Sequence, residues 1–239
     1  MLQKLLMEGR YDKITTKVTR DSMNVIKDIT KKTSREQPKY RGKTVYIAST
    51  GHARKKPQLS PGKEVFSKTY NDRVSDIEFE YYFYVFRDEA LPVPVAVDGF
   101  VVDDDIHIAA LINPEHERRA YSKLVGELKL TLRHEIEHLT QRGYNVKPGK
   151  RRNYNWQARG MINAFAEWGY KYYYLADETD ANLQGLYKLA KYEKRPFPDV
   201  ARDYLDDLIN QGIMNKKQSD IVYSKWKARA KKIGGLPPL

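Results

Sequence analysis

Residues 132–139 read LRHEIEHL, and this stretch contains the pattern H-E-x-x-H. On an α-helix, His134 and His138 project from the same face one turn apart, so both imidazoles can bind a single metal ion. Glu135 follows about 100° further around the helix, where its carboxylate can deprotonate a water molecule beside that metal. The stretch therefore predicts a metal-binding helix that carries its own general base.

The surrounding pattern predicts an amphipathic helix over residues 117–142, beginning after Pro114 and ending at Gly143. Its apolar stripe consists of Val125, Leu128, Leu132, Ile136 and Leu139. Glu127, Thr131, His134 and His138 gather on a different, polar face. Two histidines on the polar face of one helix are better explained as metal ligands than as core residues.

The chain has no cysteine, so a zinc site must be built from histidine, glutamate and aspartate. A catalytic zinc usually has three protein ligands. No histidine follows His138, which leaves His52, His107 or His116 as a third imidazole. A carboxylate is the better choice, and we favour Glu178 at the start of a later helix.

The helix that carries Glu178 has small or short residues on the same face, namely Ala181, Asn182 and Gly185. Such a face lets two helices approach closely, which would bring the glutamate within reach of the metal helix. Asp177 and Asp180 point in other directions around the helix. We expect them to cap the helix or to orient a ligand.

The pattern along the chain predicts an α+β fold, in which a small, mostly antiparallel sheet packs on the metal helix and a helical lobe follows. Expected strands are 44–48, a central strand 77–87, 95–97 and 100–102 around a turn at Asp98 and Gly99, and 106–112. Expected helices, besides 117–142, are 11–30, a largely buried segment 156–174, 175–194, 200–210 and 218–232. The loop 49–62 separates the first two strands, and we interpret its His52 as solvated.

These elements are expected to form a single domain over residues 1–239. It would consist of an N-terminal lobe 1–115 with a basic helix, a linker and the sheet, then the active-site helix 117–142, then a helical lobe 150–239.

The formal net charge is +12, and residues 1–75 and 146–239 carry the basic excess. Basic flanks can attract nucleic acid or acidic partners, but no nucleic-acid motif accompanies them. There is no signal peptide and no apolar run near 18 residues, so we expect a cytoplasmic protein that does not enter a membrane.

The chain resembles the zincin metallopeptidases, and among them the short gluzincins of the ImmA/IrrE-like kind. The resemblance rests on a strand that ends in Ile112 and Asn113, on the H-E-x-x-H helix, and on a later E-x-x-A-N sequence that begins at Glu178. It spans roughly residues 76–190. The chain departs from the group at Gln184 and Gly185, where Phe-Ala often stands, and in the 39 residues that lie between His138 and Glu178.

This resemblance implies a zincin-like fold and a zinc-dependent metalloendopeptidase that hydrolyses proteins or peptides. Zinc would be held by His134, His138 and Glu178, and Glu135 would act as the general base on the zinc-bound water. By the same resemblance, residues 106–112 are expected to form the sheet edge that pairs with an extended substrate. The residue that stabilises the oxyanion stays open among Tyr170, Tyr172, Tyr173, Tyr174 and several arginines.

Two other kinds of function remain open. The first is a binding or structural protein that keeps a zincin fold without turnover, such as an assembly component of a phage-like particle. The second is a metal hydrolase that does not cleave peptides. A deformylase-type enzyme is disfavoured because its cysteine ligand is missing, and an H-x-x-x-H enzyme of RNA processing because it needs a third histidine downstream.

Overall fold

A mixed four-stranded sheet forms the centre of the N-terminal half of the molecule. Its strands are β1 (Phe66–Asp72), β2 (Ile77–Arg87), β3 (Val95–Val102) and β4 (Asp105–Ile112). They lie in the order β1-β2-β4-β3, with β2 and β4 parallel and the two outer pairings antiparallel. The expectation of an α+β fold is therefore confirmed, and one of the three pairings is parallel.

The computed structural model describes residues 11–33, 66–73, 75, 77–87, 91–102, 105–113, 117–141, 169–233 and 236–239. The expected strand 44–48, the loop 49–62 with His52, the residue His116 and most of the expected segment 156–174 lie outside these ranges. The last part of that segment is described, and it forms the 3-10 helix η2 (Gly169–Tyr174).

The expected turn at Asp98 and Gly99 is wrong, because both residues lie inside the continuous strand β3. They pair with Ala109 and Ile108 of β4. A Cβ on Gly99 would lie 2.6 Å from Ile108 Cδ1 and 2.8 Å from Thr131 Cγ2. The glycine is thus explained by the close approach of a helix to the strand, and not by a turn.

The expectation that residues 106–112 form a sheet edge is also wrong. β4 lies between β2 and β3, and it is buried from Ile108 to Ile112. A strand enclosed on both sides has its backbone hydrogen bonds already taken. Among the described strands, β3 is the outer strand on this side of the sheet.

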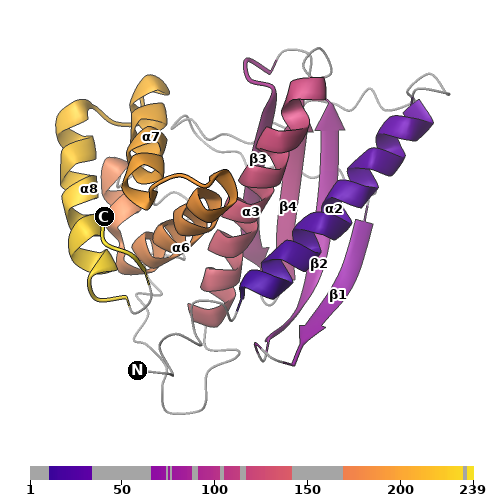
Figure 1. Ribbon diagram of the computed structural model, residues 1–239, viewed down its shortest axis with the longest axis horizontal. Helices are drawn as coiled ribbons and strands as arrows, with labels where there is room; N and C mark the ends of the chain where they lie inside the picture. Colours follow the sequence, from indigo (N-terminus) through magenta and orange to yellow (C-terminus); the bar gives the residue numbers. More distant parts are fainter. Residues whose placement is uncertain are drawn as a thin grey trace.

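Two helices, α2 (Asp12–Thr33) and α3 (Glu117–Gln141), lie on one face of the sheet (Figure 1). Both helices were expected from the sequence at nearly these bounds. The sheet contributes alternate residues to the core, with Ile77, Phe79, Tyr81 and Phe83 of β2 buried. The expected apolar stripe of α3 lies in this core. The hydroxyl groups of Tyr81 and Ser22 are 2.6 Å apart, which joins β2 to α2.

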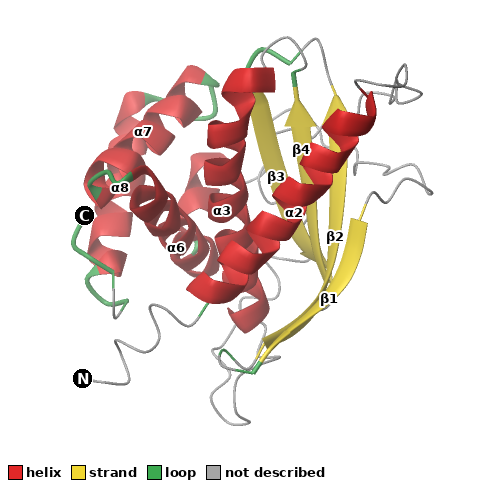
Figure 2. Ribbon diagram, turned by 45° about the vertical axis from the view of Figure 1, so that its right-hand side comes forward, coloured by secondary structure: helices red, strands yellow, loops and turns green. Residues whose placement is uncertain are grey.

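The C-terminal part consists of η2 followed by α6 (Ala176–Glu193), α7 (Phe197–Asn210) and α8 (Lys216–Ala230). The last three helices were expected from the sequence at nearly these bounds. These helices form a group beside α3, away from β1 and β2 (Figure 2). They have a second hydrophobic core, with Trp226 fully buried at 0% exposure. Of the helices within the described ranges, none has the length and apolar character needed to span a membrane.

Candidate metal centre

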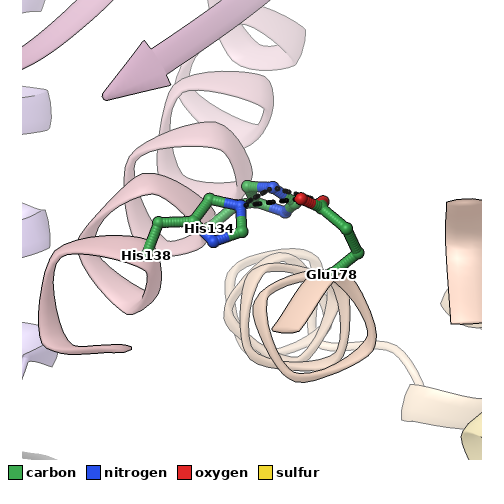
Figure 3. Close-up of side chains that lie close together, drawn as sticks. All are labelled: His134, His138 and Glu178. Carbon is green, nitrogen blue, oxygen red and sulfur yellow. Dashed lines mark hydrogen bonds and ion pairs between the residues drawn. The ribbon is translucent and has the colours of Figure 1, made fainter. Parts of the chain in front are cut away.

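Three metal-ligating side chains meet between α3 and α6. His134 and His138 come from α3 and Glu178 from α6, and the three point toward one another (Figure 3). One ligand atom from each residue lies within 4.8 Å of the others. The structure thus brings together the three residues that the sequence singled out as ligands.

The distances between these atoms suit a tetrahedral metal ion. The Nε2 atoms of His134 and His138 are 2.9 Å apart. The Glu178 carboxylate places Oε2 3.6 Å from His134 Nε2 and Oε1 3.5 Å from His138 Nε2. Ligand atoms that surround a tetrahedral zinc at about 2.0–2.1 Å lie about 3.3 Å from each other. Small adjustments would therefore place all three at bonding distance from one ion.

The Glu178 carboxylate is a buried charge that lacks a full set of partners. The residue is 6% exposed, and among the described residues its Oε2 finds no hydrogen-bond partner. Burial raises the pKa of this carboxyl, but the nearby imidazoles of His138 and His134 outweigh burial and hold the pKa well below its usual range. A buried oxygen without a partner costs about 1–3 kcal/mol, and more when it is charged. A bound cation would remove this cost, so the donor set fits a metal ion.

Two glycines allow α3 and α6 to approach closely. A Cβ on Gly185 of α6 would lie 2.8 Å from the backbone oxygen of Leu130. On the opposite helix, a Cβ on Gly126 would lie 3.0 Å from Leu189 Cδ1. The expectation that a small face of the later helix permits close approach to the metal helix is confirmed at Gly185.

Helix α8 fixes the segment that presents Glu178. Arg229 donates from Nε and Nη2 to the two carboxylate oxygens of Asp180, each over 2.6 Å. Trp226 Nε1 donates to the backbone oxygen of Tyr173 over 2.6 Å. Asp180 thus lies against α8 and is not part of the three-residue cluster, and neither is Asp177.

The expected general base, Glu135, lies next to the cluster on the side of the sheet. It is 5% exposed, and its Cγ is 3.0 Å from the position that a Cβ on Gly99 would occupy. The structure therefore places Glu135 between α3 and the outer strand β3, and it is not one of the three clustered ligands.

Tyr172, one of the four candidate tyrosines, interacts with both glutamates. Burial raises the pKa of its phenol well above the usual value, and the nearby charge of Glu178, a hydrogen bond to Glu178 and the charge of Glu135 raise it further. The phenol therefore remains protonated and able to donate. The sequence offered no signal to distinguish it, because four tyrosines occupy five consecutive positions. Tyr170 and Tyr174 pair with each other.

His107, which the sequence left open as an alternative third metal ligand, lies on β4, away from the cluster. Its ring stacks between Tyr82 and Phe100, with ring centroids 4.6 Å and 4.9 Å away. Its Nδ1 is 3.2 Å from the hydroxyl of Tyr84. The ring alternates along β4 with Ile106 and Ile108, which are buried against the helices, so it faces the other side of the sheet.

Comparisons of the chain with protein-family models, with curated proteins and with solved structures gave no match. The chemistry of the centre is therefore inferred from three features of the molecule itself. These are the spacing of the histidines on α3, the burial of Glu178 opposite them, and the position of Glu135 beside β3.

Proposed function

We propose that the protein is a zinc-dependent metallopeptidase whose metal is held by His134, His138 and Glu178. The observation that carries the proposal is the buried Glu178 carboxylate, which faces two imidazoles and has an oxygen without a hydrogen-bond partner among the described residues. Two histidines and one carboxylate without cysteine form a donor set typical of catalytic zinc. The resemblance of the sequence to the gluzincins supports the same assignment.

The roles of the side chains follow from their positions. When bound, zinc would polarise the scissile carbonyl and lower the pKa of water. Glu135, adjacent to the ligands, would take the proton of the attacking water and pass it to the leaving amine. Tyr172, which stays protonated beside both glutamates, would donate a hydrogen bond to the oxyanion that develops on the substrate.

The outer strand β3 would bind the substrate backbone. Glu135 packs against β3 at Gly99, so a peptide that pairs with this strand would pass close to the general base. Addition of an extended peptide to an outer strand supplies main-chain hydrogen bonds without regard to sequence. We therefore assign peptide binding to β3 in place of β4.

The proposal predicts that Glu135→Gln abolishes peptide hydrolysis and leaves zinc bound. The variant keeps the shape of the side chain but removes the group that accepts the proton. The measurement is the digestion of a peptide library by the zinc-loaded protein, with zinc content determined on the same samples. The control is Glu137→Gln, since Glu137 lies on the same helix but pairs with Arg133 over 3.0 Å.

Full activity of Glu135→Gln would remove this mechanism. Zinc binding without cleavage of any peptide would favour the non-catalytic alternative. Cleavage of an ester or phosphoester panel, with peptides left intact, would favour a metal hydrolase of another kind.

A further inference from the structure

Helix α2 carries a row of cations along the side that faces away from the sheet. Lys13, Lys17, Arg20 and Lys27 are all exposed. At about 100° per residue, these four positions lie within an arc of about 80°. The opposite side of the helix is apolar and is buried on the sheet through Ile14, Val18 and Ile26. Figure 1 shows α2 as the outermost element over β1 and β2.

Two acidic residues beside this row whose side chains are described, Asp12 and Asp21, interact with cations outside it. Asp12 pairs with Lys188 over 3.1 Å and with Lys191 over 3.5 Å. Asp21 accepts hydrogen bonds from Lys68 and from the hydroxyl of Tyr70, each over 2.9 Å. No ion pair joins the four cations of the row to a carboxylate within the described part of the chain. Among the described residues, the row is therefore a strip of positive charge in which only Arg20 has an electrostatic interaction with a neighbouring carboxylate, that of Asp21.

A cleft of about 410 Å³ continues the row toward α6. It is lined by Asp12, Lys13, Thr16, Lys17, Arg20 and Lys188. Burial lowers the pKa of Lys188, and the neighbouring cations Lys129 and Lys191 lower it further, against the opposing effect of Asp12. An anion in this cleft would offset the mutual repulsion of these amines.

We propose that this row and the adjoining cleft bind the phosphate backbone of double-stranded nucleic acid without sequence preference. Lys13 and Lys27 are separated by 14 helical residues, which corresponds to about 21 Å along the axis. One strand of a duplex presents about six phosphates over that length. Lysine and arginine side chains on a straight, exposed helix can follow such a backbone.

The surroundings of the row favour a duplex over a single strand. Binding of single strands relies on exposed aromatic rings that stack on bases. Among the described residues, the aromatic ring that contacts the row is that of Tyr70, which is 1% exposed and is covered by the amines of Lys17 and Lys68, 5.7 Å and 5.2 Å from its centroid. This ring is not available to a base, so the contact is with phosphates.

The test is the salt dependence of binding to a fluorescent duplex of about 20 base pairs, first DNA and then RNA, measured by anisotropy on the full chain. With four phosphate contacts, the logarithm of affinity should fall with a slope of about −3.6 against the logarithm of salt concentration, which is a loss of about 150-fold in affinity between 50 and 200 mM. In the triple variant Lys13→Gln, Lys17→Gln, Arg20→Gln, the slope should decrease in magnitude to about −1. The three side chains are exposed, and an unchanged melting temperature would show that the fold is intact.

A matched control removes the same amount of charge from exposed positions along another helix, with Lys217→Gln, Lys225→Gln and Lys231→Gln on and just after α8. This control should bind the duplex like the parent. An equal loss of duplex affinity in the two triple variants, or no loss of duplex affinity in the α2 variant, would overturn the proposal. Binding to phosphatidylserine vesicles in place of either duplex would also overturn it. His134→Ala should leave duplex binding unchanged, so this proposal and the metallopeptidase proposal can fail separately.

Discussion

At the scale of single residues, the site depends on which of three neighbouring acids faces the histidines. Asp177, Glu178 and Asp180 lie within one helical turn at the start of α6. Only Glu178 reaches both imidazoles, whereas Asp180 is bound by the guanidinium of Arg229. The sequence alone favoured Glu178, and the structure provides the reason through the direction of each side chain.

Alanine substitution of each acid in turn should separate their roles. Glu178→Ala should lose zinc, because it removes one of three ligands. Asp180→Ala should lower zinc affinity by about 10- to 100-fold, because it releases Arg229 and loosens the start of α6. Asp177→Ala should bind like the parent. The measurement is competition with a chelator of known affinity, and an Asp177 or Asp180 variant that loses zinc while Glu178→Ala retains it would contradict the assignment.

Asp21 should make the stability of the protein depend on pH at the acidic end. Burial raises the pKa of this carboxyl, but hydrogen bonds from Lys68 and Tyr70 outweigh burial and lower it below its ordinary value of 3.8. A lowered pKa stabilises the folded state above the unfolded value, and this stabilisation is lost as pH falls through the folded pKa. Asp21→Asn should therefore cost about 1 kcal/mol at pH 7, and the difference should shrink below about pH 4.

The experiment is urea denaturation of the parent and of Asp21→Asn between pH 3 and pH 7. The exposed Asp220 of α8 offers a control in Asp220→Asn. A free-energy difference between parent and Asp21→Asn that stayed constant over the whole range would show that the ion pair does not contribute.

At the scale of secondary-structure elements, the approach of α3 to α6 determines whether the ligands meet. The two contacts that limit the approach differ in kind. Gly185 faces the backbone oxygen of Leu130, which cannot move without the helix, whereas Gly126 faces the end of the flexible Leu189 side chain. The same substitution at the two glycines should therefore have different effects.

Gly185→Ala should push the helices apart, destabilise the protein by about 1–3 kcal/mol and weaken zinc binding. Gly126→Ala should be near neutral, because Leu189 can rotate away and alanine favours the helix by up to about 1 kcal/mol. Thermal unfolding and zinc titration of both variants provide the comparison. Equal behaviour of the two variants in both measurements would mean that the close contact at Gly185 does not control the site.

Local sequence patterns predicted most elements but not how the strands are arranged. The periodicity of apolar residues identified α2, α3 and α6, because each buries one face of a helix. The parallel pairing of β2 with β4 joins strands separated by β3 in the chain, and no local pattern encodes it. Asp98-Gly99 resembles a turn in the sequence, because the helix that packs against Gly99 leaves no trace in the residues around it. The two histidines were evident from their spacing, whereas Glu178 also required the small face of α6 and the family resemblance.

At the scale of the whole molecule, the proposed metal centre lies where two hydrophobic cores meet. The apolar stripe of α3 belongs to the core on the sheet, whereas Leu183, Leu186 and Ala190 of α6 belong to the C-terminal core. Two ligands come from the first helix and one from the second. A metal ion bound there would link the two halves of the fold and stabilise both, since ligands that bind only the native state raise its stability.

The most direct test of the central claim is the zinc content of the purified full chain after reconstitution with zinc and removal of excess metal. The parent protein should hold about one zinc per chain, and His134→Ala should hold close to none. A parent protein with less than about 0.2 equivalents, and no difference from His134→Ala, would contradict the assignment of His134, His138 and Glu178 as a zinc site.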